Sequence, residues 1–479
     1  MPTSKKSGGT KKTTVVRARA NAPANETGIE IDSTEFVEPG TTGRFLILMR
    51  EDSVKAGVRA VTDATGLSVA SAADYADLGM DSSALELEQA VVFEDLGVAV
   101  VNTPPEQIQA LSAAAADDNP ILAIEPERIN YTLQEDWPET GETVPPVPAR
   151  PSELATNPIE YLRGYRDAVN HLVGKLLAAG GAAEEVTGEG LIAALNEAEL
   201  TWGLQVTKAA TSRFSGQGIR VAVLDTGLDL GHPDFVGRRI VSQSFIPGQT
   251  VQDGHGHGTH CIGTACGPRR PGRLPRYGVA FDAEIFAGKV LSNQGSGPDG
   301  SILAGIQWAI TNRCQIVSMS LGSRVLPGQT FSPIYEQVAQ RALAAGTLII
   351  AAAGNDSNRP GSISPVSRPA NSPSIMAVAA LDPQLRVARF SNAGINPQGG
   401  QVDIAGPGVD VISTWPRPRL YNTISGTSMA TPHVAGIAAL LAQANPGARG
   451  RALASLLSQR ARRLTLPARD VGAGLVQAP

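Results

Sequence analysis

Short apolar runs alternate with helical stretches from about Thr201 to the end of the chain. Because the runs lack a polar alternation, they predict a parallel sheet that helices cover on both faces. In such sheets functional groups gather beyond the carboxyl ends of the strands. The expected strands are 219–225, 315–321, 347–354 and 374–381, and the expected helices are 301–313, 332–345 and 429–443. The predicted fold class is therefore α/β, with a doubly wound, mostly parallel sheet.

The N-terminal region has a different pattern, in the order β-α-β-β-α-β, which predicts a small α+β unit ahead of the sheet. Val54, Val58 and Val61 recur at helical spacing, whereas short apolar runs bounded by turn residues indicate strands. The expected strands are 44–49, the two halves of 90–101, and 121–125, and the expected helices are 53–65 and one that starts at Thr103.

The remaining segments connect or precede these two units. Residues 1–40 have no apolar period and predict a disordered arm. Within 134–200 we expect a proline-rich acidic linker, an amphipathic helix at 159–178 and a short helix at 191–200. The predicted division is thus 1–40, 41–133, 134–200 and 201–479.

Composition narrows the class of protein. The 479 residues are 42% hydrophobic and 18% charged, which is typical of a globular chain. Three cysteines exclude a disulfide framework, and no apolar run reaches the length of a membrane span. The basic N-terminus has no apolar segment behind it, so we expect a cytoplasmic protein or one exported without a conventional leader.

Charge is distributed unevenly between the two units. The net charge is −10 over 41–133 and −8 over 134–200, but +12 over 201–479. Opposite charges favour a complementary contact between the units, although two independently solvated surfaces would give the same numbers. Nucleic-acid binding is not expected, because the arginines are scattered and aromatic residues make up only 4% of the chain.

Three motifs bring together the residues of nucleophilic catalysis. Asp225 ends an apolar strand, His257 lies in Asp-Gly-His-Gly-His-Gly-Thr-His, and Ser428 opens an apolar helix in Gly-Thr-Ser-Met-Ala-Thr-Pro. Serine is a weak nucleophile and needs a neighbouring base, which His257 can supply. Asp225 can hold the tautomer of that histidine. Asn355 follows another apolar strand, so its carboxamide can project into the same cleft and stabilise an oxyanion.

These motifs, in the order Asp, His, Asn, Ser, resemble those of the subtilisin-like serine proteases. The resemblance covers the chain from about Trp202 to its end and implies a serine endopeptidase that works through an acyl-enzyme on Ser428. It implies that Asp225 orients His257, that His257 is the general base and acid, and that Asn355 donates to the oxyanion.

The resemblance also implies a substrate cleft and a proenzyme. Two segments resemble the strands between which the family binds a peptide, and they consist of Gly295, Ser296 and Gly297 on one side and Ser320, Leu321 and Gly322 on the other. The unit at 41–133 resembles the family's propeptide, which acts as folding chaperone and inhibitor. The expected partners are polypeptide substrates and the chain's own propeptide, with no nucleic acid and no membrane, and we expect a monomer.

Some residues depart from the family's pattern. His255 stands beside the catalytic histidine and either lines the second subsite or is a surface histidine. Asp299 and Arg368 fall near the fourth subsite, where we expect them to pair and shrink it, while Ser367 narrows the primary pocket. We therefore expect an apolar or medium-sized residue before the scissile bond. Cys261 lies next to the catalytic machinery and is either reactive or a small buried hydrophobe.

Metal chemistry is not expected at the site. His255, His257 and His260 have the spacing of some zinc hydrolases, but that alternative leaves Ser428 and Asn355 unexplained. The segment after Cys266 is rich in arginine, a poor neighbour for calcium, although Asp234 matches one calcium ligand of the family. We expect no cofactor for the chemistry and doubt the family's strong calcium site.

Two other functions fit the same residues. One is a catalytically silent protein that uses this cleft to hold peptides. The other is a protease with one dedicated partner, in which the helix at 159–178 would be the docking element.

Overall fold

The computed structural model describes residues 40–72, 89–113, 120–133 and 198–479. The expected arm at 1–40, the linker and the helix at 159–178 therefore lie outside the described residues, apart from residue 40. Of the expected helix at 191–200, only residues 198–200 are described, and they form a turn and an isolated bridge instead.

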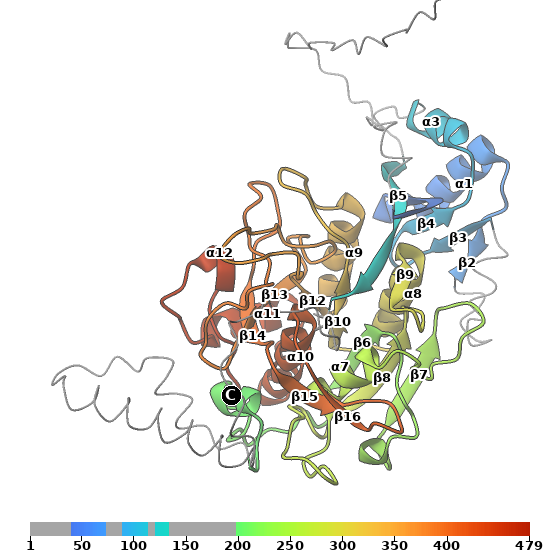
Figure 1. The fold of residues 1–479 in the computed structure, drawn as a ribbon. Coiled ribbons are helices and arrows are strands. Elements are labelled where there is room, and N and C mark those ends of the chain that lie inside the picture. Colours follow the sequence, from blue (N-terminus) through green and yellow to red (C-terminus); the bar gives the residue numbers. More distant parts are fainter. Residues whose placement is uncertain (1–39, 73–88, 114–119, 134–197) are drawn as a thin grey trace, which may run out of the picture.

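The C-terminal unit is built on a seven-stranded parallel sheet (Figure 1). Its strand order is β14 (Ile404–Pro407), β13 (Met376–Leu381), β12 (Leu348–Ala352), β10 (Ile316–Met319), β6 (Arg220–Asp225), β8 (Glu284–Lys289) and β7 (Ile240–Ser244). Most residues of these strands are buried, which accounts for the uninterrupted apolar runs in the sequence. The α/β fold class predicted from those runs is confirmed.

Helices cover both faces of this sheet. The helices are α6 (Trp202–Val206), α7 (His257–Cys266), α8 (Asp299–Thr311), α9 (Pro333–Ala344), α10 (Thr427–Ala444), α11 (Arg451–Arg460) and α12 (Ala468–Val471). Apolar side chains of α8 and α9 belong to the core on one face, and those of α7 and α10 to the core on the other. The C-terminal unit also contains a short 3₁₀ turn at Pro233–Phe235 and a hairpin of β15 (Val411–Thr414) and β16 (Tyr421–Ile424). A second 3₁₀ turn, Glu51–Ser53, lies in the N-terminal unit.

The N-terminal unit is a second sheet with two helices on its outer face. It consists of β1 (Thr41–Met49), α1 (Val54–Thr65), β2 (Ala70–Ser71), β3 (Ala90–Phe93), β4 (Val98–Val101), α3 (Pro105–Ala113) and β5 (Ile121–Thr132). Alternate residues of β1 face opposite sides, so Ile47 packs in the core with α1 and α3. Leu46 and Leu48 instead share a core with α8 and α9 of the other unit. The two units are thus packed against each other through buried apolar side chains.

Strand β5 joins the two units in one sheet. Its first half pairs with β1, and its second half pairs antiparallel with β9 (Ser296–Pro298) and β11 (Leu321–Gly322) of the C-terminal unit. In Figure 1 the long arrow of β5 runs from the N-terminal unit into the C-terminal one. Two expectations were wrong here. The strand expected at 121–125 continues to Thr132, and the one expected at 315–321 ends at Met319.

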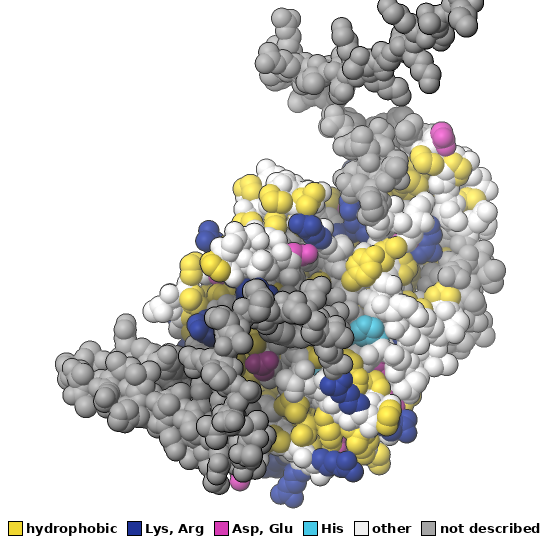
Figure 2. Space-filling model, in the orientation of Figure 1, with side chains coloured by type: hydrophobic (Ala, Val, Ile, Leu, Met, Phe, Trp, Pro, Cys, Tyr) yellow, Lys and Arg dark blue, Asp and Glu magenta, His cyan; other side chains and the backbone are white. Residues whose placement is uncertain are grey.

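The surface of the C-terminal unit carries many basic side chains. Figure 2 shows Lys and Arg gathered over the lower part of that unit, near the hairpin of β15 and β16. The described part of the chain contains no helix that is both long and apolar enough to cross a membrane.

Candidate active site

Asp225 and His257 form a buried hydrogen-bonded pair. Asp225 is the last residue of β6, and His257 is the first residue of α7. The Nδ1 atom of His257 lies 2.8 Å from Oδ1 of Asp225, and neither side chain is more than 1% exposed. Burial has the largest single influence and lowers the pKa of His257, but the Asp225 carboxylate and Cys261 together raise this pKa above its ordinary value. Since the carboxylate fixes the hydrogen on Nδ1, Nε2 is left to accept a proton.

Asp253 holds the turn that positions His257. Its carboxylate accepts the backbone N–H groups of His255, Gly256 and Thr259, the hydroxyl of Thr259 and the hydroxyl of Thr226. Gly256 precedes the helix with φ of +108°, and an added Cβ would lie 2.4 Å from the ring of Trp415. The start of α7 therefore depends on both a buried acid and a glycine at this place.

Ser428 is the second residue of α10 and lies close to the pair. The Sγ atom of Cys261 lies 3.8 Å from Nδ1 of His257 and 3.6 Å from the carbonyl oxygen of Ser428. The Ser428 hydroxyl donates to the carbonyl oxygen of Ser320 at 3.1 Å, so it is not bonded to Nε2 of His257 in this conformation. Rotation about one side-chain bond frees the Ser428 hydroxyl from the carbonyl oxygen of Ser320.

Asn355 faces the cleft with the donor end of its carboxamide. Its Nδ2 donates to the carbonyl oxygen of Leu133 at 2.7 Å. Its Oδ1 accepts the backbone N–H and the hydroxyl of Thr427 at 3.0 and 2.8 Å, which fixes the orientation of the amide. Gly354 has φ of +108°, and an added Cβ would lie 2.1 Å from Oγ of Ser367, so the strand needs glycine just before Asn355.

The end of β5 occupies the groove between the two segments that the sequence analysis placed around a peptide. On one side Asn130 and Tyr131 are opposite Gly297 and Ser296, and the N–H of Thr132 donates to the carbonyl oxygen of Gly295 at 3.0 Å. On the other side Tyr131 and Thr132 pair with Gly322 and Leu321. The N–H of Leu133 points to the carbonyl oxygen of Ser320 at 3.4 Å. These residues are thus bound as an added strand.

Leu133 is the residue nearest to the chemistry. An ideal Cβ on Gly322 would lie 3.2 Å from Cδ1 of Leu133 and 3.4 Å from Cβ of Ser367, so the Leu133 side chain lies beside these two residues. Its carbonyl oxygen is the one that Asn355 holds. An aliphatic residue therefore precedes the bond between Leu133 and Gln134.

His255 lies near Thr132, the residue before Leu133 in the bound strand. Its ring makes an edge contact with His257 at 6.2 Å between centroids. An ideal Cβ on Gly295 would lie 2.8 Å from Nε2 of His255 and 3.2 Å from Oγ1 of Thr132. The structure thus brings His255 and Thr132 to the same place.

Two acidic residues of β5 anchor the bound unit. Glu127, which is fully buried, pairs with Arg44 at 2.6 Å and accepts the N–H of Gly300 in the first turn of α8 at 2.9 Å. Glu125 accepts the hydroxyl of Ser332 and the N–H of Ile334 at the start of α9. The N-terminus of a helix carries a partial positive charge that stabilises a carboxylate. Two carboxylates of the acidic N-terminal unit thus bind the starts of two helices of the basic C-terminal unit.

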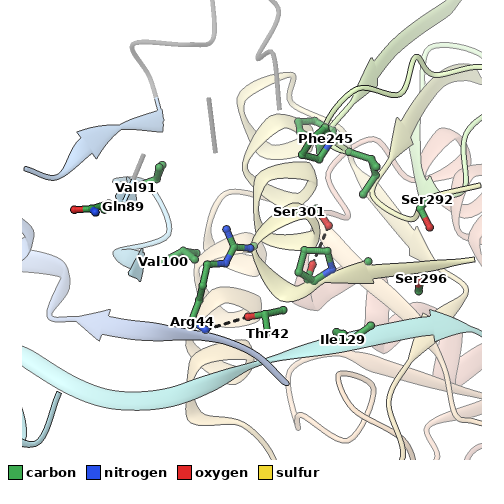
Figure 3. Close-up of a pocket in the computed structure, with 15 residues that line it drawn as sticks. Thr42, Arg44, Gln89, Val91, Val100, Ile129, Phe245, Ser292, Ser296 and Ser301 are labelled. Atoms are coloured by element: carbon green, nitrogen blue, oxygen red, sulfur yellow. Dashed lines mark hydrogen bonds between the residues drawn. The ribbon is translucent and has the colours of Figure 1, made fainter. Parts of the chain in front are cut away.

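A cavity of about 300 Å³ lies between the two units beside these anchors. Figure 3 shows Arg44, Val91 and Ile129 of the N-terminal unit facing Phe245 and Ser301 of the C-terminal unit across it. Asp225, His257 and Ser428 do not line this cavity, which belongs to the contact between the units.

Hydrogen-bond donors surround the carboxylate of Asp234, the residue that matches a calcium ligand of the family. Its carboxylate accepts the hydroxyl groups of Tyr277 at 2.6 Å and Tyr421 at 3.1 Å, and the N–H of Gly272 at 3.2 Å. Phenols and an amide donor thus occupy the oxygens that a cation would need. Burial raises the pKa of Tyr277, which keeps this phenol a hydrogen-bond donor.

The zinc alternative is wrong. His260 directs Nε2 to the carbonyl oxygen of Val411 at 3.0 Å, whereas His257 directs Nδ1 to Asp225, so the histidines do not converge on one point. Within the described ranges, one group of side chains has ligand atoms close enough to share a metal, namely Asp225, His257 and Cys261 within 4.8 Å of one another. Burial raises the pKa of Cys261, so its thiol is neutral beside the hydrogen-bonded pair.

The fold and the site together define the class of protein. The model of the Subtilase family matches residues 216–474, and this chain belongs to that family. Subtilisin E of Bacillus subtilis (strain 168) is 41% identical over 235 residues, which cover 49% of this chain and 58% of that protein. Subtilisin Savinase of Lederbergia lenta is 42% identical over 249 residues, or 51% of this chain and 85% of that protein.

A solved structure extends the similarity to the fold. Sphericase superposes with a TM-score of 0.52 at 34% identity, over 59% of this chain and 99% of its own. The chain spans less than three fifths of the length of Subtilisin E. The C-terminal unit is thus the part of the chain that shows the family.

Proposed function

We propose that the chain is a serine endopeptidase made as a proenzyme. One observation carries this proposal: Asn355 holds the carbonyl oxygen of Leu133 at 2.7 Å, while residues 129–133 lie as a strand between β9 and β11. This is the placement expected for a peptide about to be attacked by Ser428, or just cut by it.

In the proposed reaction Oγ of Ser428 attacks the carbonyl carbon as Nε2 of His257 takes the hydroxyl proton. The developing oxyanion is stabilised by Nδ2 of Asn355 and the N–H of Ser428 at the start of α10. His257 then gives the proton to the leaving amine, the peptide bond breaks, and water hydrolyses the acyl-enzyme in the reverse sense. These side chains and water suffice, so the proposal includes no cofactor and no catalytic metal.

The residues 41–133 act in this proposal as an inhibitory propeptide and the first substrate. The bond after Leu133 is the first to be cut, and polypeptides that bind as β5 does are the later substrates. Glu125, through Arg368, and Glu127, through the N–H of Gly300, hold the unit in place.

Intact mass over time tests the proposal, with the unmodified chain and Ser428→Ala side by side. We expect the unmodified chain alone to give a fragment that ends at Leu133 and one that begins at Gln134. Equal shortening of both chains would point to a contaminating protease. No shortening, together with peptide binding but no turnover, would favour the silent peptide-binding protein instead.

A further inference from the structure

We propose that the fourth subsite, counted back from the cut, selects a side-chain carboxamide. This inference rests on the proposed function, because it treats residues 130–133 as the bound substrate segment. Leu133 precedes the cut, so Asn130 is the fourth residue, and its backbone lies opposite Gly297 of β9.

Asn130 is bound through its side chain as well as its backbone. The side chain is fully buried, and its Nδ2 donates to Oδ1 of Asp299 at 2.8 Å. Because Asp299 faces it with a carboxylate oxygen, only the NH₂ end of the amide satisfies this contact. The other carboxylate oxygen of Asp299, Oδ2, accepts the backbone N–H of Arg128 at 2.8 Å.

Asp299 is held in place by residues of the C-terminal unit. It is fully buried at the first position of α8. Nη1 of Arg368 lies 3.0 Å from its Oδ2, and the hydroxyl of Tyr335 donates to its Oδ1 at 2.9 Å. Arg368 also lies over the Tyr335 ring, 4.9 Å from its centroid. The predicted pairing of Asp299 and Arg368 is confirmed, and the wall of this subsite is rigid, buried and polar.

The charges of this wall favour a neutral donor over other side chains. Asp299 is already balanced by Arg368, so a cationic side chain would bring a second cation close to Arg368. An acidic side chain would face the carboxylate of Asp299. An aliphatic side chain would leave the buried Asp299 carboxylate without the hydrogen bond that Asn130 donates. Binding would then be weaker by the free energy of a hydrogen bond to a charged group.

One buried atom of the amide and one of the wall have no hydrogen-bond partner among the described residues. Within the described residues, Oδ1 of Asn130 has no hydrogen-bond donor and Nε of Arg368 has no acceptor, although both atoms are buried. A carboxamide brings both a donor and an acceptor to this polar wall, whereas an amine or an alkyl chain does not. The preferred substrate is thus a polypeptide with Asn four residues before the cut and an aliphatic residue directly before it.

Peptide turnover by the self-processed full chain tests this selection. The probes are internally quenched peptides with Asn-Tyr-Thr-Leu-Gln and the same peptides with Leu, Ala, Arg or Asp in place of Asn. We expect kcat/KM to be about tenfold or more higher for Asn than for any of the four. In the Asp299→Ala variant the ratio of kcat/KM for the Asn peptide to kcat/KM for each of the other peptides should fall close to one. Glu284→Ala, which removes an acid paired with Arg220 and Arg239 at the start of β8, should leave the ratio unchanged.

Each other result has a definite meaning. Faster cleavage of the Leu peptide or the Arg peptide would overturn the carboxamide subsite and leave the endopeptidase standing. Cleavage of no peptide would instead contradict the proposed function.

A second measurement does not require turnover or a folded Asp299 variant. In the Ser428→Ala chain, Asn130→Leu should lower Tm more than Tyr131→Leu, because Tyr131 is 49% exposed. A higher Tm with Leu at position 130 would overturn the inference by itself.

Discussion

Thr427 determines which end of the Asn355 carboxamide faces the bound strand. Its N–H and its hydroxyl both donate to Oδ1 of Asn355, so Nδ2 is left for the carbonyl oxygen of Leu133. The hydroxyl of Thr427 in turn accepts the N–H of Gly354 at 3.2 Å. Thr427 therefore orients the amide group that holds the carbonyl oxygen of Leu133.

Thr427→Val should lower kcat about tenfold and change KM little, because misplacing one donor weakens the transition state more than binding. The measurement is steady-state kinetics on one peptide. Thr431→Val is the matched control, since its hydroxyl bonds only the carbonyl oxygen of Thr427 one turn further along α10. An equal loss of kcat in both variants would contradict an orienting role of Thr427.

Modification of Cys261 should stop turnover. Its sulfur lies between Nδ1 of His257 and the carbonyl oxygen of Ser428, so a bulky group there displaces both. Burial raises the pKa of this thiol, and we expect slow modification.

The measurement compares residual activity with the number of modified thiols in the intact mass. Cys266→Ala with Cys314→Ala leaves Cys261 as the only thiol, and the chain should remain sensitive. Cys261→Ala should make the chain resistant. Full activity after confirmed modification of Cys261 would contradict the prediction.

Because His433 is buried, we expect the free energy of unfolding of the chain to be lower at pH 5 than at pH 7. Burial lowers its pKa to about 4, and its Nδ1 bonds the carbonyl oxygen of Met429 at 2.8 Å. Below about pH 6.5 the unfolded chain takes up a proton that the folded chain refuses, so stability falls as pH falls. Between about pH 7 and 5 this amounts to about 2 kcal/mol in the free energy of unfolding.

Urea unfolding of the Ser428→Ala chain at the two pH values measures this effect without self-digestion. His433→Gln in the same background should reduce the loss. If the loss is the same with and without His433, another group is responsible.

Tyr277→Phe should destabilise the C-terminal unit by about 1–3 kcal/mol, because Asp234 is 9% exposed and would lose its shortest hydrogen bond. Millimolar calcium should not restore the loss, since Tyr421 and Gly272 still occupy the carboxylate. Urea unfolding with and without calcium provides the measurement. Recovery with calcium would show that the family's cation site persists here.

The chemistry-bearing residues could be predicted because their signals are local. Asp225 and Asn355 follow apolar strands, and Ser428 opens an apolar helix, so the rules of parallel sheets bring them to one edge. His257 and Asn355 also directly follow glycines, Gly256 and Gly354, at which an added Cβ would clash.

Other residues of the site could not be predicted because their partners are distant in sequence. Residues 126–132 contain no apolar run. Residues 126–128 form a strand by pairing with β1, and residues 129–132 continue it by pairing with the edges of β9 and β11. Thr427 and Asp253 lay within recognised motifs, but only the fold shows which groups they bond. Asp253 lies three residues before Gly256, the N-cap residue of α7, so the usual N-cap pattern does not reveal that it accepts the N–H of Thr259.

Strand β5 pairs with strands of both units, so the N-terminal unit would stay bound to the C-terminal unit after cleavage at Leu133. Hydrolysis after Leu133 would break no ladder hydrogen bond and no anchor of Glu125 or Glu127. Before the cut the N-terminal unit is tethered to the C-terminal unit, so its effective concentration at the cleft would be independent of dilution. After the cut the contact is bimolecular. The processed protein would therefore be self-inhibited in concentrated samples and would gain activity on dilution, in proportion to the fraction of cleft vacated.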